Sequence, residues 1–183
     1  MNSELRTKFL QYLRSQQKPD SGFTLIELLV VIIIIGILAS IALPTFLNQA
    51  NKAKLSEAKA YLGAINRGQQ AYYLEKWEFA DNANFSGLAV GIQTQTRNYQ
   101  YVLVGGGANS SNVTNQARPM EPSTKAAIGG VFIGSVTGTG EVTAAGIVCQ
   151  AKEAVAAGGD PGTATFNFGA MPVTCPATYE PME

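Results

Sequence analysis

The chain has 183 residues, of which 46% are hydrophobic and 14% are charged, and its 13 basic and 13 acidic side chains balance. This length suits one domain with appendages. The basic residues do not cluster with aromatic ones, so no nucleic-acid-binding motif is found. Histidine is absent, carboxylates are sparse, and no serine or cysteine nucleophile has a recognisable base nearby, so no enzyme, metal site or cofactor is expected.

The N-terminal 22 residues are polar and carry four cations, Arg6, Lys8, Arg14 and Lys18. The next 21 residues, 23–43, are almost entirely apolar and would form a helix about 31 Å long, which matches the hydrocarbon core of a membrane. A membrane helix is therefore predicted despite the many β-branched residues, because lipid requires a backbone whose hydrogen bonds are satisfied internally. The flanking cations predict a cytoplasmic N-terminus and an exported remainder.

A second, amphipathic part of the same helix is predicted over residues 44–76. Pro44 should bend the helix at its start. Beyond this proline, apolar residues recur at helical spacing, namely Leu47, Leu55, Ala58, Leu62, Ile65 and Tyr72. A helix of this combined length is longer than a compact domain of this size, so we expect much of it to project and to be buried against something else.

The remainder of the chain predicts a β-rich head. Residues from Trp77 onward are rich in turn formers, and strands are expected at 98–104, 113–118, 126–133 and 142–150. The proline-rich stretch after Gly158 is expected to be ordered loop. The predicted fold class is α+β, with one long N-terminal helix packed on an antiparallel sheet.

The two cysteines, Cys149 and Cys175, are too few and too far apart for a zinc site. If the head is exported, a disulfide between them is the natural interpretation, and two buried free thiols are the alternative. The glycine triplet at 105–107 lacks the pattern of a phosphate loop and predicts a turn. The aromatic residues at the end of the helix are expected to pack in the core and neck of the head, and these are Tyr72, Tyr73, Trp77 and Phe79.

The junction SGFTLIELLVVIIIIGILASIALP resembles the N-terminal signature of type IV prepilins, in which glycine precedes phenylalanine, TLIE and an apolar helix. The later segments NQANKAKLSEAKAYLGAINRGQQAYYLE, TRNYQYVL and GGVFIG resemble the pilin-like G/H group. This resemblance implies cleavage between Gly22 and Phe23 by a prepilin peptidase, followed by methylation of the Phe23 amine. It also implies a precursor in membrane lipid, which the inner-membrane assembly machinery extracts into a helical surface filament of identical subunits.

The resemblance implies roles for three residues of the apolar helix. Glu27 would meet the N-terminal amine of a neighbouring subunit and fix the axial register, because a displaced subunit would leave both charges unpaired. The alternative is that Glu27 only favours the first helical turn through the helix dipole or pairs with its own Phe23 amine. Gly36 would mark either a place where the helix loosens or a close helix contact. Pro44 would mark either melting on assembly or a simple bend.

The resemblance divides the chain into a leader at 1–22, a membrane and filament-core helix at 23–43, an amphipathic helix at 44–76 and a head at 77–183 with a disulfide-closed C-terminal loop. The expected function is that of a type IV pilus subunit supporting motility, adhesion or DNA uptake. A minor pilin or a type II secretion pseudopilin shares the N-terminal signature. An uncleaved single-pass membrane protein with a ligand-binding head is an alternative of another class.

Overall fold

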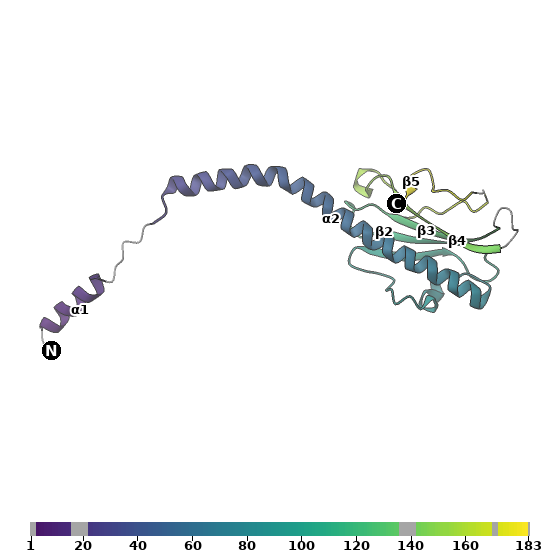
Figure 1. Ribbon diagram of the computed structural model, residues 1–183, viewed down its shortest axis with the longest axis horizontal. Helices are drawn as coiled ribbons and strands as arrows, with labels where there is room; N and C mark the ends of the chain where they lie inside the picture. The colour runs from purple at the N-terminus through teal and green to yellow at the C-terminus, as the bar shows by residue number, and fades with distance from the viewer. Residues whose placement is uncertain (1–2, 16–21, 136–141, 170–171, 183) are drawn as a thin grey trace. The chain divides into compact units, whose positions relative to one another are not determined.

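The computed structural model describes residues 3–15, 22–135, 142–169 and 172–182. The chain divides into two units, residues 1–46 and residues 47–183, and each is described by itself. Two α-helices and five strands are found in the described residues (Figure 1). The predicted α+β class is thereby confirmed.

The first unit contains helix α1, Ser3–Ser15, and the beginning of helix α2, Leu25–Lys76. This helix within the N-terminal 22 residues was not predicted. Its sequence places Glu4 in the first turn, where a carboxylate interacts favourably with the helix dipole. Within the described part of the chain, α2 is the one helix that is long and apolar enough to cross a membrane, and none of its apolar window is buried.

Helix α2 continues without interruption past Gly36 and Pro44 to the residue at which the sequence predicted its end. A proline in a helix interior lacks the N–H that would bond to the carbonyl four residues earlier, here Ser40. Separately, the Ser40 hydroxyl donates to the carbonyl of Ile37 at 2.7 Å, within the preceding turn. The bend predicted at Pro44 remains a prediction, since its neighbours belong to two separately described units.

The second unit is built on a five-stranded antiparallel sheet in the order β1-β2-β3-β4-β5. The strands are β1 Tyr99–Gly105, β2 Asn112–Pro119, β3 Ala127–Ser135, β4 Val142–Ala151 and β5 Tyr179–Pro181. The first four match the predicted strands to within two residues at each end. The fifth corrects the expectation of loop alone after Gly158: it pairs with β4 through three residues, with Ala151 opposite Tyr179.

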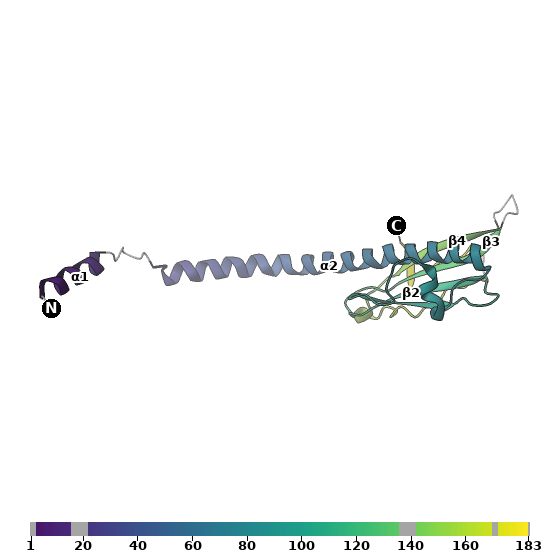
Figure 2. The ribbon, with the colours of Figure 1, turned by 90° about the horizontal axis from the view of Figure 1, so that it is seen from below.

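The two faces of the sheet are covered by different segments. The C-terminal half of α2 lies along one face, as Figure 2 shows, and buries a cluster that includes Leu62, Ile65 and Val131. On the other face, the segment between β4 and β5 buries a second cluster that includes Ile128 and Phe166. Because side chains alternate along a strand, β3 contributes to both clusters.

Two short 3-10 helices complete the connections, η1 at Asn82–Leu88 and η2 at Val155–Ala157. The first begins at Asp81, whose side chain accepts a hydrogen bond from the Asn84 N–H at 2.9 Å. The glycine triplet forms the predicted turn after β1, and all three residues have positive φ. A Cβ at Gly106 would lie 2.6 Å from the Ala80 carbonyl oxygen, so this turn also needs glycine for close approach.

Candidate assembly site

The start of α2 is closed by reciprocal hydrogen bonds between Thr24 and Glu27. The Glu27 N–H donates to Thr24 Oγ1 at 3.3 Å, and the Glu27 carboxylate accepts from the Thr24 N–H at 2.9 Å and from its hydroxyl at 2.7 Å. This arrangement is a capping box, which satisfies backbone donors that a helix start leaves unpaired. The TLIE sequence carries the T-x-x-E spacing of this motif, and that spacing could have identified Thr24 as a cap.

Glu27 is surrounded in sequence by side chains that expose their apolar surface. Phe23 is 88% exposed, and Ile26 and Leu28 are also exposed. Every residue from Gly22 to Gln49 is exposed in the structure. Uncovered apolar area of this extent is rare on a soluble protein and marks a surface that contacts a membrane or other protein chains.

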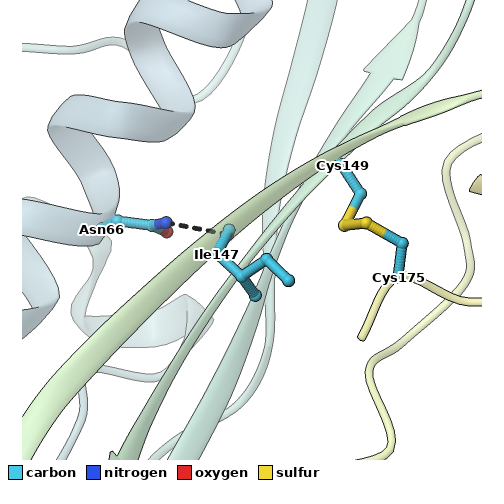
Figure 3. Close-up of a disulfide and its surroundings, with 4 residues drawn as sticks. All are labelled: Asn66, Ile147, Cys149 and Cys175. Atoms are coloured by element: carbon cyan, nitrogen blue, oxygen red, sulfur yellow. Dashed lines mark hydrogen bonds between the residues drawn. A yellow bond between two sulfur atoms is a disulfide. The ribbon is translucent and has the colours of Figure 1, made fainter. Parts of the chain in front are cut away.

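Amide side chains fix the second half of α2 to the sheet. Asn66 Nδ2 donates to the Ile147 carbonyl at 3.1 Å (Figure 3), and Gln70 Nε2 donates to the Ala144 carbonyl at 2.8 Å. The Asn66 carbonyl in turn accepts from Asn115 Nδ2 at 2.7 Å. Both contacted carbonyls belong to β4, so these bonds set one position of the helix along that strand.

A further amide, Gln69, holds the chain that follows the helix. It is fully buried, and its side chain both donates to the Ala80 carbonyl and accepts from the Ala80 N–H, each at 2.9 Å. Sequence periodicity predicted an apolar helix face and missed the buried Asn66 and Gln69. Amides on a helix usually face water, and no pattern in the sequence distinguishes these two from exposed ones.

Glu57 connects the middle of α2 to the segment before β1. Its carboxylate accepts from Thr96 Oγ1 at 2.7 Å and from Asn98 Nδ2 at 2.5 Å. Burial, together with the nearby Glu57 charge, raises the pKa of the Tyr99 and Tyr101 hydroxyls. Both tyrosines are therefore neutral at physiological pH, and the Tyr99 hydroxyl donates to the Lys125 carbonyl at 2.8 Å.

The C-terminal loop is attached to the sheet by the predicted disulfide between Cys149, on β4, and Cys175 (Figure 3). Asp160 organises the same loop. Its Oδ1 accepts from the backbone N–H groups of Gly162 and Thr163 at 2.7 and 2.9 Å and from the Tyr179 hydroxyl at 2.8 Å. The loop is therefore fixed covalently at one point and by a carboxylate at another.

The charge of Asp160 is favoured by its hydrogen bonds. Partial burial acts to raise the pKa of this carboxyl, but the bonds from Tyr179 and from the backbone of Thr163, Gly162 and Ala164 outweigh burial and lower it. On the other side of the contact, burial and the bond to Asp160 raise the pKa of Tyr179. Asp160 is thus ionised and Tyr179 neutral across the physiological range.

The aromatic residues at the end of α2 divide into two groups. Phe79 is fully buried, and Tyr73 packs against it with ring centroids 4.8 Å apart. Trp77 does not belong to the core as expected: its side chain is 77% exposed, and its ring meets Tyr73 edge-on with ring centroids 6.1 Å apart. Its φ of 59° is unusual for a bulky side chain.

Comparison with known proteins gives matches to two family models. The prokaryotic N-terminal methylation motif matches residues 17–43, which include Gly22, Phe23 and Glu27. The type IV pilin-like G and H family matches residues 55–176, which is two thirds of the chain and covers most of the head. No solved structure matches.

Curated relatives include pilins and a secretion protein. The chain is 47% identical over 70 residues to the type IV major pilin protein PilA of Myxococcus xanthus, covering 38% of the chain and 32% of PilA. It is 34% identical over 89 residues to the type IV wide pilus major component PilA4 of Thermus thermophilus, covering 49% of the chain and 67% of PilA4. It is 36% identical over 85 residues to the type II secretion system core protein G of Pseudomonas aeruginosa, covering 46% of the chain and 58% of that protein.

The chain thus spans about a third of the length of the Myxococcus pilin and less than two thirds of the Pseudomonas protein. The two family models cover different parts, one the apolar start of α2 and the other its second half with the sheet. The helix-on-sheet head and the methylation motif lie in one chain, which belongs to the type IV pilin-like G and H family.

Proposed function

We propose that the chain is a structural subunit of a type IV pilus and that it acts by assembly. The single observation that carries this proposal is the exposed first half of α2, which begins at a methylation motif and continues into a folded head. A membrane covers this surface before assembly, and the helices of other copies cover it in the filament. The names of the pilin relatives support the same function.

Processing prepares the chain for assembly. Residues 1–22 are a leader that remains in the cytoplasm because of its four cations. Prepilin peptidase cuts between Gly22 and Phe23, and the Phe23 amine is then methylated and stays cationic. The inner-membrane assembly machinery extracts the processed subunit, and residues 23–43 become part of the filament core.

Glu27 sets the axial register in this proposal. Before cleavage, position 23 carries a peptide nitrogen with no charge, and the carboxylate is held by Thr24. Cleavage creates a cationic amine at each Phe23, and assembly brings the amine of one subunit to the Glu27 of another. A charge in a dry helix bundle is costly unless paired, so only registers that pair the two charges are favourable.

Gly36 and Pro44 are the points at which the assembled helix deviates. Apart from the neighbouring backbone of its own helix, no described atom lies within 4 Å of a Cβ built at Gly36, so this glycine does not serve a close contact in the subunit. Its helix propensity is lower than that of alanine by about 1 kcal/mol, which makes it a place for close helix contact or local loosening in the filament. Pro44 acts as a bend in the free subunit.

Mass spectrometry of the mature N-terminus tests the proposal. We expect a chain that begins at Phe23 with one added methyl group. A chain that retains Met1 in cells with an active prepilin peptidase would show instead an uncleaved single-pass membrane protein, and the proposal would be wrong.

The second candidate function is that of a minor pilin or a type II secretion pseudopilin. The similarity to the core protein G of a type II secretion system favours the latter. Both candidates predict the same methylated Phe23. Abundance distinguishes them, because a major subunit is the main protein of filaments sheared from the cell surface, whereas a minor pilin or pseudopilin is at most a trace component.

A further inference from the structure

The end of the head helix α2 presents an aromatic side chain in an unusual conformation. Trp77 occupies the first position after α2, and its N–H bonds back to the Tyr73 carbonyl at 2.8 Å. This position has left-handed backbone geometry, which glycine adopts without strain. A bulky and exposed tryptophan at a strained position points to a contact outside the subunit. Leu74, also 77% exposed, lies beside it.

The charges around Trp77 are mainly negative. Glu75 and Glu78 flank it, with Lys76 between them, and neither carboxylate forms an ion pair with any described residue. This segment, residues 74–78, is called the tryptophan knob below. It combines an apolar centre with a net negative rim.

A groove of about 500 Å³ lies elsewhere on the same head, between α2 and the segments that follow β2 and β4. It is lined by apolar Leu55 and Ala157 and by polar residues that include Lys52, Lys125, Asn51 and Gln150. A smaller hollow of about 220 Å³ continues it past Lys59. This lysine groove has the volume to take a tryptophan side chain.

The groove carries more positive than negative charge. Lys52 and Lys59 form no ion pair with the described residues, and Lys125 lies 3.9 Å from Glu180 in an exposed contact. Glu153 is the one carboxylate that lines the groove, against three lysines over its length. Lysine ammonium groups bind the face of an indole ring favourably, and the amides offer acceptors for its N–H.

We propose that the tryptophan knob of one copy of this chain docks into the lysine groove of a second copy. Within one chain the contact is impossible, because Trp77 directly follows α2 and lies 22 residues after Leu55, a helical distance of about 33 Å. A parallel second copy displaced by about this distance brings the two surfaces together. The surfaces differ, so the contact is heterologous and repeats from copy to copy without closing, as a filament requires.

This inference rests on the proposed pilus function and adds a contact between heads. Trp77 is the only tryptophan in the chain, so its fluorescence reports the contact without a label. We expect a blue-shifted emission and a several-fold lower acrylamide quenching constant in sheared filaments than in detergent-solubilised full-length subunits. Equal quenching in both would overturn the contact. Equal protection in unassembled subunits reconstituted into phosphatidylglycerol-containing vesicles would also overturn it, by showing that lipid covers Trp77.

Cross-linking tests the position of the knob. Cells that express one copy with Lys76→Cys and one with Ala157→Cys should give a dimer with a short bifunctional maleimide, because both residues are exposed and Trp77 is kept. The matched control replaces Ala157→Cys with Ser86→Cys, which is exposed on η1 away from the groove. Equal dimer yields from both pairs would overturn the proposal.

Trp77→Gly separates assembly from folding. Glycine fits the left-handed position, so the head should be at least as stable to heat as the wild type, while filament yield falls several-fold. Normal filaments from Trp77→Gly would overturn the contact. A wild-type chain that forms no filaments and keeps its leader would instead contradict the proposed pilus function, so the two failures are distinguishable.

Discussion

Single residues determine how closely the layers of the head approach one another. Gly129 and Gly130 are neighbours on β3, and each faces one covering layer. A Cβ at Gly129 would lie 2.7 Å from Asn66 Oδ1, and a Cβ at Gly130 would lie 2.7 Å from the ring of Phe166. Glycine weakens a strand interior, but here these two make room for the helix on one side and for the C-terminal loop on the other.

We expect Gly129→Ala to destabilise the head by about 1–3 kcal/mol, because the added methyl group displaces Asn66 from its two hydrogen bonds. Gly146→Ala is the matched control on β4. Its Cβ would meet Asn66 at 3.5 Å, an ordinary contact, so its effect should be within about 1 kcal/mol and can be stabilising. Urea unfolding of the full chain in detergent measures both, and equal destabilisation by the two variants would contradict this account.

Asp160 makes the stability of the loop depend on pH. Its pKa is lowered in the folded protein, so its contribution is fully present above the unfolded pKa of about 4 and is lost as pH falls through the folded value. Asp160→Ala should therefore lower thermal stability at pH 7 and reduce the further loss on acidification below about pH 4. Glu75→Ala, which removes an exposed helix carboxylate, is the control. An unchanged acid profile in Asp160→Ala would show that other carboxylates dominate.

At the scale of elements, the disulfide connects the least regular segment to β4. The closed loop has a sequence separation of 26, for which the chain-entropy model gives about 3.5 kcal/mol. We expect the double variant Cys149→Ala and Cys175→Ala to lose about 3 kcal/mol of unfolding free energy, and a thiol assay of the denatured, unreduced wild type should find no free thiol. Two titratable thiols in the wild type would contradict the disulfide.

Elements with a strong local sequence pattern could be predicted, whereas the one that depends on long-range contacts could not. Helix α2 and the first four strands follow from local periodicity and turn residues, which act over short distances in the chain. Strand β5 has three residues, includes Pro181 and gains its order from pairing with β4 and from the nearby disulfide. Long-range contacts of this kind leave no local pattern, and the sequence therefore predicted loop.

The residues of the candidate assembly site also differ in whether a local sequence pattern identifies them. Glu27 is identifiable because a charge inside an apolar run is conspicuous, and the cysteines because they are only two. Asn66 and Gln69 could not be identified, since their burial depends on where the helix meets β4 and the residues after it. The exposure of Trp77 was missed because aromatic residues are on average more often buried.

At the scale of the whole molecule, the proposed register role of Glu27 makes assembly depend on its charge. We expect Glu27→Ala to leave cleavage and methylation at Phe23 intact and to reduce the yield of sheared filaments at least about tenfold, because the charge pair that favours one register is lost. The measurements are mass spectrometry of the N-terminus and filament yield. Thr24→Ala is the control: it removes the capping hydroxyl, costs the helix about 1 kcal/mol and keeps the carboxylate, so filaments should form. Normal filaments from Glu27→Ala would contradict the register argument.

The amide contacts between α2 and β4 have a mechanical consequence. A filament that bears tension would transmit the load between its core and each head through α2. A purely apolar contact can slide by small steps, whereas the bonds from Asn66 to Ile147 and from Gln70 to Ala144 exist at one position only. A pull along the helix loads both bonds sideways at the same time, so they must break together. These two hydrogen bonds, which hydrophobic periodicity does not predict, therefore make the head resist being pulled off its own helix.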